Sequence, residues 1–296
     1  MAEEPLLSAI EYGGGFPILF VHGWTMRGQA EAYDFEPIFE GNKDFRRIYV
    51  DLPGMGSTPA NGIQDLDDIF ERLTQFIDER FSTSSNFALA GSSCGGYLAR
   101  ALAQKYNDRV DGLLLRVPLM EPDDRLRDRD PFESLVQNKN FMASLPAEHK
   151  AVLGDHVLIQ TPTYHQALRN KYKDVYLPAT EAADNKVLEP IRADPRRYSL
   201  SSPNFDPARE RLLAPTLILV GRQDEDVGYR DSLRLTERYP RSTHVVLDRG
   251  VHALPVDERN LFDALVRDWI YRIKEWRSSR DAQNTTVSGR RSSRTT

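Results

Sequence analysis

Six short runs of hydrophobic residues recur along the chain, and turn-forming residues follow them. Each run has the length of a strand, and its hydrophobic residues are mostly consecutive rather than alternating with polar ones. Consecutive hydrophobic residues are typical of strands buried on both faces between helices, as in a parallel sheet. The predicted strands are residues 17–21, 47–50, 86–90, 110–117, 216–220 and 244–247.

Between these strands lie segments in which hydrophobic residues recur every three or four positions, the period of an amphipathic helix. Residues 66–81 and 261–276 show this pattern most clearly. Strands and helices therefore alternate along the chain. This order predicts an α/β fold with a mostly parallel central sheet flanked by helices.

The alternation is interrupted between residues 119 and 205, where prolines separate helix-like pieces. A structureless loop of this length is implausible inside a compact domain. We therefore expect residues 119–205 to form a helical cap, or lid, inserted into a core built from residues 1–118 and 206–277. Residues 278–296 are rich in serine, threonine and arginine with almost no hydrophobic residues, which predicts a disordered tail.

The composition narrows the range of partners. The chain has 296 residues, of which 40% are hydrophobic and 28% charged, as in ordinary globular proteins. Its net charge of −5 gives no electrostatic reason to expect nucleic acid or an anionic membrane as a partner. Cys94 is the single cysteine, which excludes an intramolecular disulfide and a cysteine-based metal cage. Since no signal peptide or bilayer-length hydrophobic run is found, we expect a cytoplasmic protein.

One segment combines a predicted strand, a G-x-S-x-G motif and a helix-forming stretch. The strand at 86–90 runs directly into Gly91, Ser93 and Gly95. In a nucleophile elbow, the serine occupies a sharp strand-to-helix turn, and the residues two positions away must be small for the turn to close. The helix N-terminus favours the negative charge that develops there. Ser93 is the predicted nucleophile, and Ser92 is the weaker alternative because alanine and cysteine flank it at those two positions.

A serine hydroxyl needs an oriented base before it can attack a carbonyl group. In hydrolases with an elbow, an acid and then a histidine follow the serine along the chain. Asp224 follows the fifth predicted strand, and His252 follows the sixth. Both thus lie at carboxyl ends of strands, as Ser93 does. We predict His252 as the base and Asp224 as the acid that orients it, with Asp226 and then Glu225 as alternative acids.

These motifs resemble those of the α/β-hydrolase superfamily over nearly the whole chain outside the tail. The closest resemblance is to its capped branch, which includes lyase-like enzymes, C–C-bond hydrolases, esterases and aminopeptidases. The resemblance rests on an oxyanion loop, the elbow, an acid loop whose third residue after glycine is the acid, and a base loop. In this chain they are residues 22–24, 91–96, 221–224 and 249–252.

The resemblance implies further roles. The backbone N–H groups of Trp24 and Cys94 are expected to form the oxyanion hole, so that Cys94 contributes its amide rather than its thiol. His22 is expected to be a structural hydrogen-bonding residue, and no cofactor is required. The base loop departs from the family in one place, since Val251 stands directly before the histidine where glycine is usual.

Arg116 lies near the carboxyl end of a predicted buried strand, where a charge must have a partner. One interpretation is an ion pair that tethers the cap through Glu121, Asp123 or Asp124, which are close in sequence. The other is a substrate-binding role, in which the guanidinium holds a substrate carboxylate through two hydrogen bonds.

The sequence thus predicts a serine hydrolase that transfers an acyl group from a small-molecule ester. A serine at the elbow argues against epoxide hydrolases and haloalkane dehalogenases of this fold, which have aspartate there. C–C-bond hydrolysis and cleavage of N-terminal proline peptides remain alternatives. A third alternative is a ligand-binding receptor of the same fold with little turnover.

Overall fold

The computed structural model describes residues 6–154 and 156–292. Its centre is a seven-stranded sheet in the order β1-β3-β2-β4-β5-β6-β7. β1 is antiparallel to β3, and the other neighbouring strands are parallel. All six predicted strands are present, and β1 is added to them at the edge. The strands are β1 Ala9–Gly13, β2 Phe16–Val21, β3 Phe45–Val50, β4 Phe87–Ser92, β5 Val110–Arg116, β6 Thr216–Gly221 and β7 Ser242–Leu247.

Helices connect the strands, as the alternating pattern predicts. The start of α2 illustrates the local signals, because the Asp65 side chain accepts a hydrogen bond from the Asp68 N–H and caps the helix. The helices outside residues 119–205 are α1 Gly28–Phe35, η1 Glu36–Phe39, α2 Leu66–Arg80, α3 Cys94–Lys105, η2 Asn107–Arg109, η5 Arg230–Arg234, α9 Leu235–Arg238 and α10 Arg259–Ser292.

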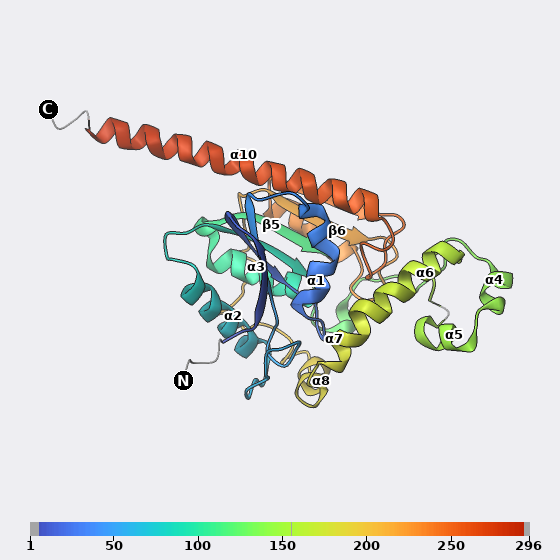
Figure 1. Ribbon diagram of the computed structural model, residues 1–296. Coiled ribbons are helices and arrows are strands. Elements are labelled where there is room, and N and C mark those ends of the chain that lie inside the picture. The colour runs from blue at the N-terminus through green and yellow to red at the C-terminus, as the bar shows by residue number, and fades with distance from the viewer. Residues whose placement is uncertain (1–5, 155, 293–296) are drawn as a thin grey trace.

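Alternate side chains of β2 show which helices cover each face of the sheet. Leu19 and Val21 pack in a hydrophobic cluster with residues of α2 and α3. Ile18 and Phe20 pack in a second cluster with residues of α1 and α10. The sheet is therefore covered by helices on both faces (Figure 1), which confirms the predicted fold class.

The elements named between β5 and β6 are all helices, and α4, α5 and α6 extend to one side of the sheet (Figure 1). A small hydrophobic cluster holds part of this segment together, and Val251 and Val256 from the loop after β7 pack against it. Its elements are η3 Asp124–Leu126, α4 Lys139–Ser144, α5 Ala147–Leu153, α6 Pro162–Lys171, η4 Tyr172–Tyr176, α7 Leu177–Glu181 and α8 Asn185–Ala193.

The C-terminal segment differs from the expected disorder. α10 continues as a helix to Ser292, well beyond residue 277. Arg280 anchors its middle part by donating to the Asp111 carboxylate at 2.7 Å and to the Asp108 carbonyl. No proline interrupts residues 278–292, so the helical backbone continues once started. The rest of the predicted tail, 293–296, lies outside the described residues.

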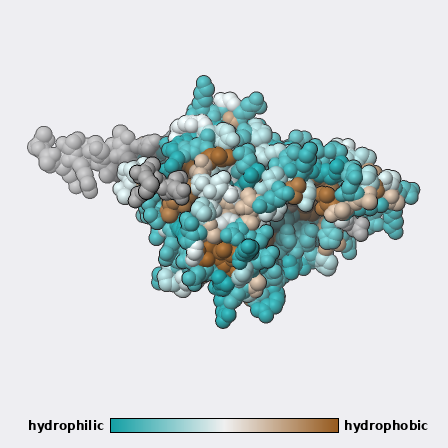
Figure 2. All heavy atoms as spheres, turned by 60° about the horizontal axis from the view of Figure 1, so that its bottom comes forward, coloured by the Kyte–Doolittle hydropathy of each residue, from teal (hydrophilic) through white to brown (hydrophobic). Residues whose placement is uncertain are grey.

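The surface is mostly hydrophilic on the face shown in Figure 2, with separate hydrophobic areas between the polar ones. Among the described residues, no helix has both the length and the apolar character needed to cross a membrane.

Candidate active site

Ser93 occupies the turn between β4 and α3, with φ 52° and ψ −120°. A positive φ at a residue other than glycine is strained and persists only where the surroundings enforce it. Backbone crowding explains the flanking glycines. A Cβ added at Gly91 would lie 2.3 Å from the Gly95 carbonyl oxygen, and one at Gly95 would lie 2.1 Å from the Val21 carbonyl oxygen. The strand, turn and helix thus have the geometry of a nucleophile elbow.

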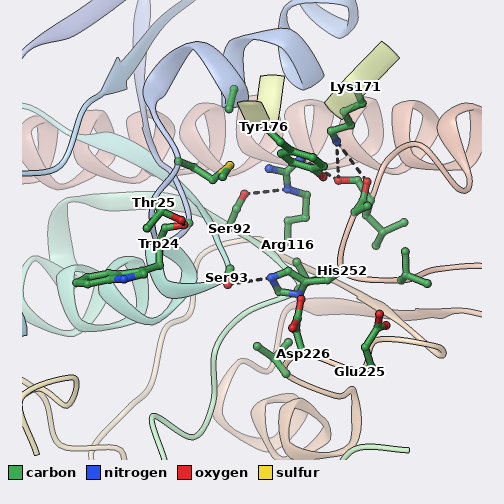
Figure 3. A pocket seen from close by; sticks show the side chains of 18 of the residues that line it. Trp24, Thr25, Ser92, Ser93, Arg116, Lys171, Tyr176, Glu225, Asp226 and His252 are labelled. Carbon is green, nitrogen blue, oxygen red and sulfur yellow. Dashed lines mark hydrogen bonds between the residues drawn. The ribbon is translucent and has the colours of Figure 1, made fainter. Parts of the chain in front are cut away.

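The loops after β6 and β7 bring the predicted acid and base to this turn. His252 Nε2 lies 3.0 Å from Ser93 Oγ (Figure 3). Its Nδ1 lies 2.9 Å from Asp224 Oδ2. A carboxylate only accepts hydrogen bonds, so Nδ1 carries the imidazole proton and donates a hydrogen bond to Asp224. Nε2 is then free to accept the proton of the Ser93 hydroxyl. The structure therefore brings the three predicted side chains together in one hydrogen-bonded chain.

The geometry also shows which of the three candidate acids contacts His252. Asp224 is buried, and its second oxygen accepts the N–H groups of Asp226 and Val227 at 2.9 and 3.0 Å. These bonds hold the carboxylate in the orientation that meets the imidazole. Asp226 and Glu225 line the nearby cavity, and Asp224 is the acid hydrogen-bonded to His252.

Electrostatics favour the protonated form of the base. Burial disfavours the imidazolium of His252, but the charge of Asp224 and its hydrogen bond outweigh this effect. Asp226 adds a smaller attraction, and the net result is a pKa of His252 above its usual 6.5. The imidazolium form of His252 is therefore stabilised, and this is the form that would result if the imidazole took a proton from Ser93.

His22 has a structural role in the adjacent loop, as predicted. Its Nε2 accepts the Leu52 N–H at 3.0 Å, so its Nδ1 carries the proton and donates to the Gly23 carbonyl at 2.7 Å. Burial lowers the pKa of His22, which favours this neutral form. The loop lies against the nucleophile, since a Cβ added at Gly23 would be 3.2 Å from Ser93 Cβ.

The two residues predicted to supply oxyanion donors are Trp24, in the loop next to Ser93, and Cys94, which directly follows Ser93. Trp24 follows Gly23 in the loop and lines the cavity, where its ring packs edge-to-face on Tyr198. Cys94 is the first residue of α3, and its side chain is fully buried. Burial raises the pKa of its thiol to about 11, so the side chain is neutral and poorly suited to attack a substrate.

A cavity of about 490 Å³ lies beside Ser93 and His252. Much of its lining comes from residues 119–205, including both aliphatic and aromatic side chains. The part near Ser92 is polar, with charged side chains from α1, β5 and α6. Residues that line the cavity include Trp24, Met26, Phe132, Leu158, Tyr164 and Leu168, and at the polar part Glu31, Asp34, Arg116, Lys171 and Tyr176.

Arg116 borders the cavity, but its partners differ from those expected. The predicted partners Glu121, Asp123 and Asp124 form ion pairs with other arginines. The guanidinium instead pairs with Glu31 at 2.7 Å and with Asp34.

This guanidinium also donates to Ser92 Oγ at 2.8 Å (Figure 3) and to the Leu254 carbonyl at 3.1 Å. Lys171 Nζ in α6 completes the cluster, at 2.8 Å from Asp34 Oδ2. Two acids and two bases thus neutralise one another in the buried wall of the cavity. Sequence reasoning missed three of these four residues, because they are far apart along the chain.

Although Val251 departs from the family pattern, the base loop is fixed by a hydrogen bond and by side-chain packing at this residue. The Val251 N–H donates to Asp257 Oδ2 at 2.9 Å. The residue of the loop that closely approaches the rest of the backbone is Gly250, one position before Val251. A Cβ added at Gly250 would lie 2.9 Å from the Cα of Gly221. The valine side chain packs against the hydrophobic cluster of the segment between β5 and β6. A glycine there would lack this contact.

Among the described residues, no group of three or more histidine, cysteine, aspartate or glutamate side chains is arranged to hold a metal ion.

Comparison with known proteins agrees with the fold. Residues 18–264 match the alpha/beta hydrolase family. The chain belongs to this family. A solved structure of an alpha/beta superfamily hydrolase from Oenococcus oeni is similar to it, with a TM-score of 0.78 and 27% identity over 91% of this chain and 97% of that chain.

Curated relatives of this hydrolase are named as esterases and lipases. A pimeloyl-[acyl-carrier protein] methyl ester esterase of Shewanella woodyi is 34% identical, over 87% of this chain and 95% of that protein. A monoacylglycerol lipase of Mus musculus is 25% identical, over 86% of this chain and 75% of that protein. These relatives support an esterase-like hydrolase, the class of enzyme that the sequence predicts.

Proposed function

We propose that this hydrolase is a serine esterase in which Ser93 attacks the carbonyl carbon of a small-molecule ester. His252 takes the hydroxyl proton at Nε2, and Asp224 holds the imidazole in the required tautomer and stabilises its charge. The alcohol leaves with the proton carried by His252. A water molecule, activated by the same imidazole, then releases the acyl group from Ser93. The observation that carries the proposal is the hydrogen-bonded chain from Ser93 Oγ through His252 to Asp224.

The backbone N–H groups of Trp24 and Cys94 are the proposed oxyanion donors. Cys94 begins α3, so its N–H lies at the positive end of the helix dipole, beside the nucleophile. Gly23, next to Trp24, closely approaches Ser93, since a Cβ added there would lie 3.2 Å from Ser93 Cβ. Removing one such donor typically costs about 3 kcal/mol of transition-state stabilisation.

Residues 119–205 act as the cap in this proposal. They line the cavity beside Ser93 with hydrophobic side chains such as Phe132, Leu158 and Leu168, which suit the carbon chain of an ester. The acidic side chains that line the cavity are Glu31, Asp34, Glu225 and Asp226, and they belong to the core. An aminopeptidase that bound the amine of its substrate through the cap would need acidic side chains there, so the lining favours an ester over a peptide.

The experiment compares the purified protein with its Ser93→Ala variant, using a fluorescent fluorophosphonate and a series of p-nitrophenyl esters of increasing acyl length. We expect labelling and turnover in the wild type, and a loss of turnover of roughly 10⁶-fold in the variant. We also expect kcat/KM to rise with acyl length until the acyl group fills the cavity.

Three outcomes would count against this proposal. Labelling with slow or single turnover would favour the receptor alternative. Turnover of β-diketone acids in preference to esters would favour C–C-bond hydrolysis. A folded wild-type protein that neither reacts with the probe nor turns over esters would refute the role of Ser93.

A further inference from the structure

Helix α6 is linked to the loop that carries His252 both before and after this residue in the sequence. Tyr164, Leu168 and Lys171 lie on successive turns of the helix, so they share one face. All three are buried, and all three line the cavity. This face therefore packs inward, toward the loop after β7.

On one side of His252, the contact runs through a carboxylate. The Tyr164 hydroxyl donates to Asp257 Oδ1, while the other oxygen of Asp257 accepts the Val251 N–H at 2.9 Å. Val251 is the residue directly before His252, and its side chain packs in the same cluster as Tyr164 and Leu168. The hydroxyl of Tyr164 thus holds the group that fixes the backbone at residue 251.

On the other side, the contact is direct. Lys171 Nζ donates to the carbonyls of Ala253 and Leu254, the two residues after His252, at 3.3 and 3.4 Å. Asp34 holds the ammonium group in place from the core, at 2.8 Å. Arg116 donates to the same Leu254 carbonyl from the sheet. The backbone after the histidine is therefore held by two cations, one from the core and one from α6.

We infer that α6 is a positioning element for His252, with Tyr164 and Lys171 as its positioning residues. The core supplies Asp224 and Arg116. From α6, Lys171 bonds the carbonyl of residue 253, and Tyr164 bonds Asp257, the partner of the residue 251 N–H. Because the same helix face lines the cavity, a substrate that fills the cavity touches the residues that hold the base. The inference rests on the proposed function, since it takes His252 as the base.

The test uses Tyr164→Phe, Lys171→Met and the double variant, each in the full chain. The matched control is Arg230→Gln. Arg230 lies in η5 and joins residues 119–205 to the core through ion pairs with Asp128 and Asp130 at 2.9 and 2.6 Å. This control weakens the attachment of the cap at a place that does not contact the base loop.

Two readouts are measured for each variant. The first is kcat and KM for a p-nitrophenyl ester, and the second is hydrogen exchange of the peptide covering residues 249–257 without substrate. Loss of a hydrogen bond to a charged group corresponds to about a 10- to 100-fold change. We expect Lys171→Met to lower kcat and to speed exchange of this peptide by that factor, and Tyr164→Phe to change both by about 10-fold.

The double variant tests whether the two residues act through one loop. Their effects on kcat should be non-additive, while each should add to that of Arg230→Gln. Equal effects of Arg230→Gln and the α6 variants on loop exchange would overturn the inference, because general loosening of the cap would then explain them. Unchanged exchange and kcat in the α6 variants would also overturn it.

A variant that does not fold, or a wild-type protein without turnover, would not be confused with failure of the inference about α6. If Lys171→Met does not fold, Tyr164→Phe decides the question alone, since it removes one oxygen atom and keeps the ring. A wild-type protein without turnover would refute the proposed function, while exchange of residues 249–257 would still decide whether α6 holds the loop.

Discussion

Replacing Asp224 by asparagine isolates the contribution of the acid. The change keeps the shape of the side chain but removes its charge, which lies against the Nδ1 of His252 at 2.9 Å. Two unit charges about 4 Å apart in a partly buried site attract by about 4 kcal/mol. Losing this attraction for the imidazolium corresponds to about 10³-fold in rate.

The tautomer adds to this loss. An asparagine amide can donate to Nδ1, which would place the imidazole proton on Nε2, facing Ser93. A protonated Nε2 cannot accept the hydroxyl proton. The combined effect of lost charge and wrong tautomer in a serine triad is about 10⁴-fold. We expect kcat for a p-nitrophenyl ester to fall by that factor in Asp224→Asn.

The pH dependence gives a second readout for the same variant. The base acts only when neutral, so activity rises with pH as the imidazolium loses its proton. In the wild type the midpoint lies above 6.5, because Asp224 raises the pKa of His252. In Asp224→Asn the pKa of His252 falls, so the acid limb of the kcat/KM profile should move to lower pH.

Asp226→Asn is the matched control, since Asp226 also raises the pKa of His252 but is not its hydrogen-bond partner. We expect it to lose less than about 10-fold in kcat and to shift the acid limb slightly in the same direction. A large loss in Asp226→Asn with near-normal activity in Asp224→Asn would refute the assignment of the acid.

Three further predictions concern the fold and the reactivity of the site. Gly95→Ala should prevent the elbow from closing, because its Cβ would overlap the Val21 carbonyl, and circular dichroism should show a strongly lowered melting temperature. Arg116→Met should lower the free energy of unfolding in urea by about 3–5 kcal/mol, since it leaves Glu31 short of a buried partner; an unchanged midpoint would contradict this. The buried thiol of Cys94 should resist iodoacetamide in the native protein and react once the chain is unfolded in urea.

The alternation of hydrophobic strands and amphipathic helices was enough to predict the sheet. Ser93, Asp224 and His252 could be predicted for a related reason. Each follows a predicted strand, and the carboxyl ends of parallel strands meet at one edge. Their convergence is therefore a property of the fold class rather than of long-range detail.

The partners of Arg116 could not be predicted, because proximity in sequence suggested residues 121–124, while the fold brings two acidic side chains of α1 to its guanidinium. Glu31 and Asp34 precede Arg116 by more than eighty residues, and nothing local marks them as its partners. Lys171 and Tyr164 are equally hidden, since a helix face in an inserted segment gives no indication of the loop that it contacts. The helix at 278–292 was missed because its composition resembles a disordered tail.

The measurement that tests the central claim most directly is the location of the acyl group during turnover. The protein would be mixed with p-nitrophenyl acetate, quenched in acid within milliseconds, digested and mapped by mass spectrometry. The account predicts an acetyl group on Ser93, formed with a burst of nitrophenolate and absent from Ser93→Ala. An acetyl group on another residue, or turnover that persists in Ser93→Ala, would contradict it.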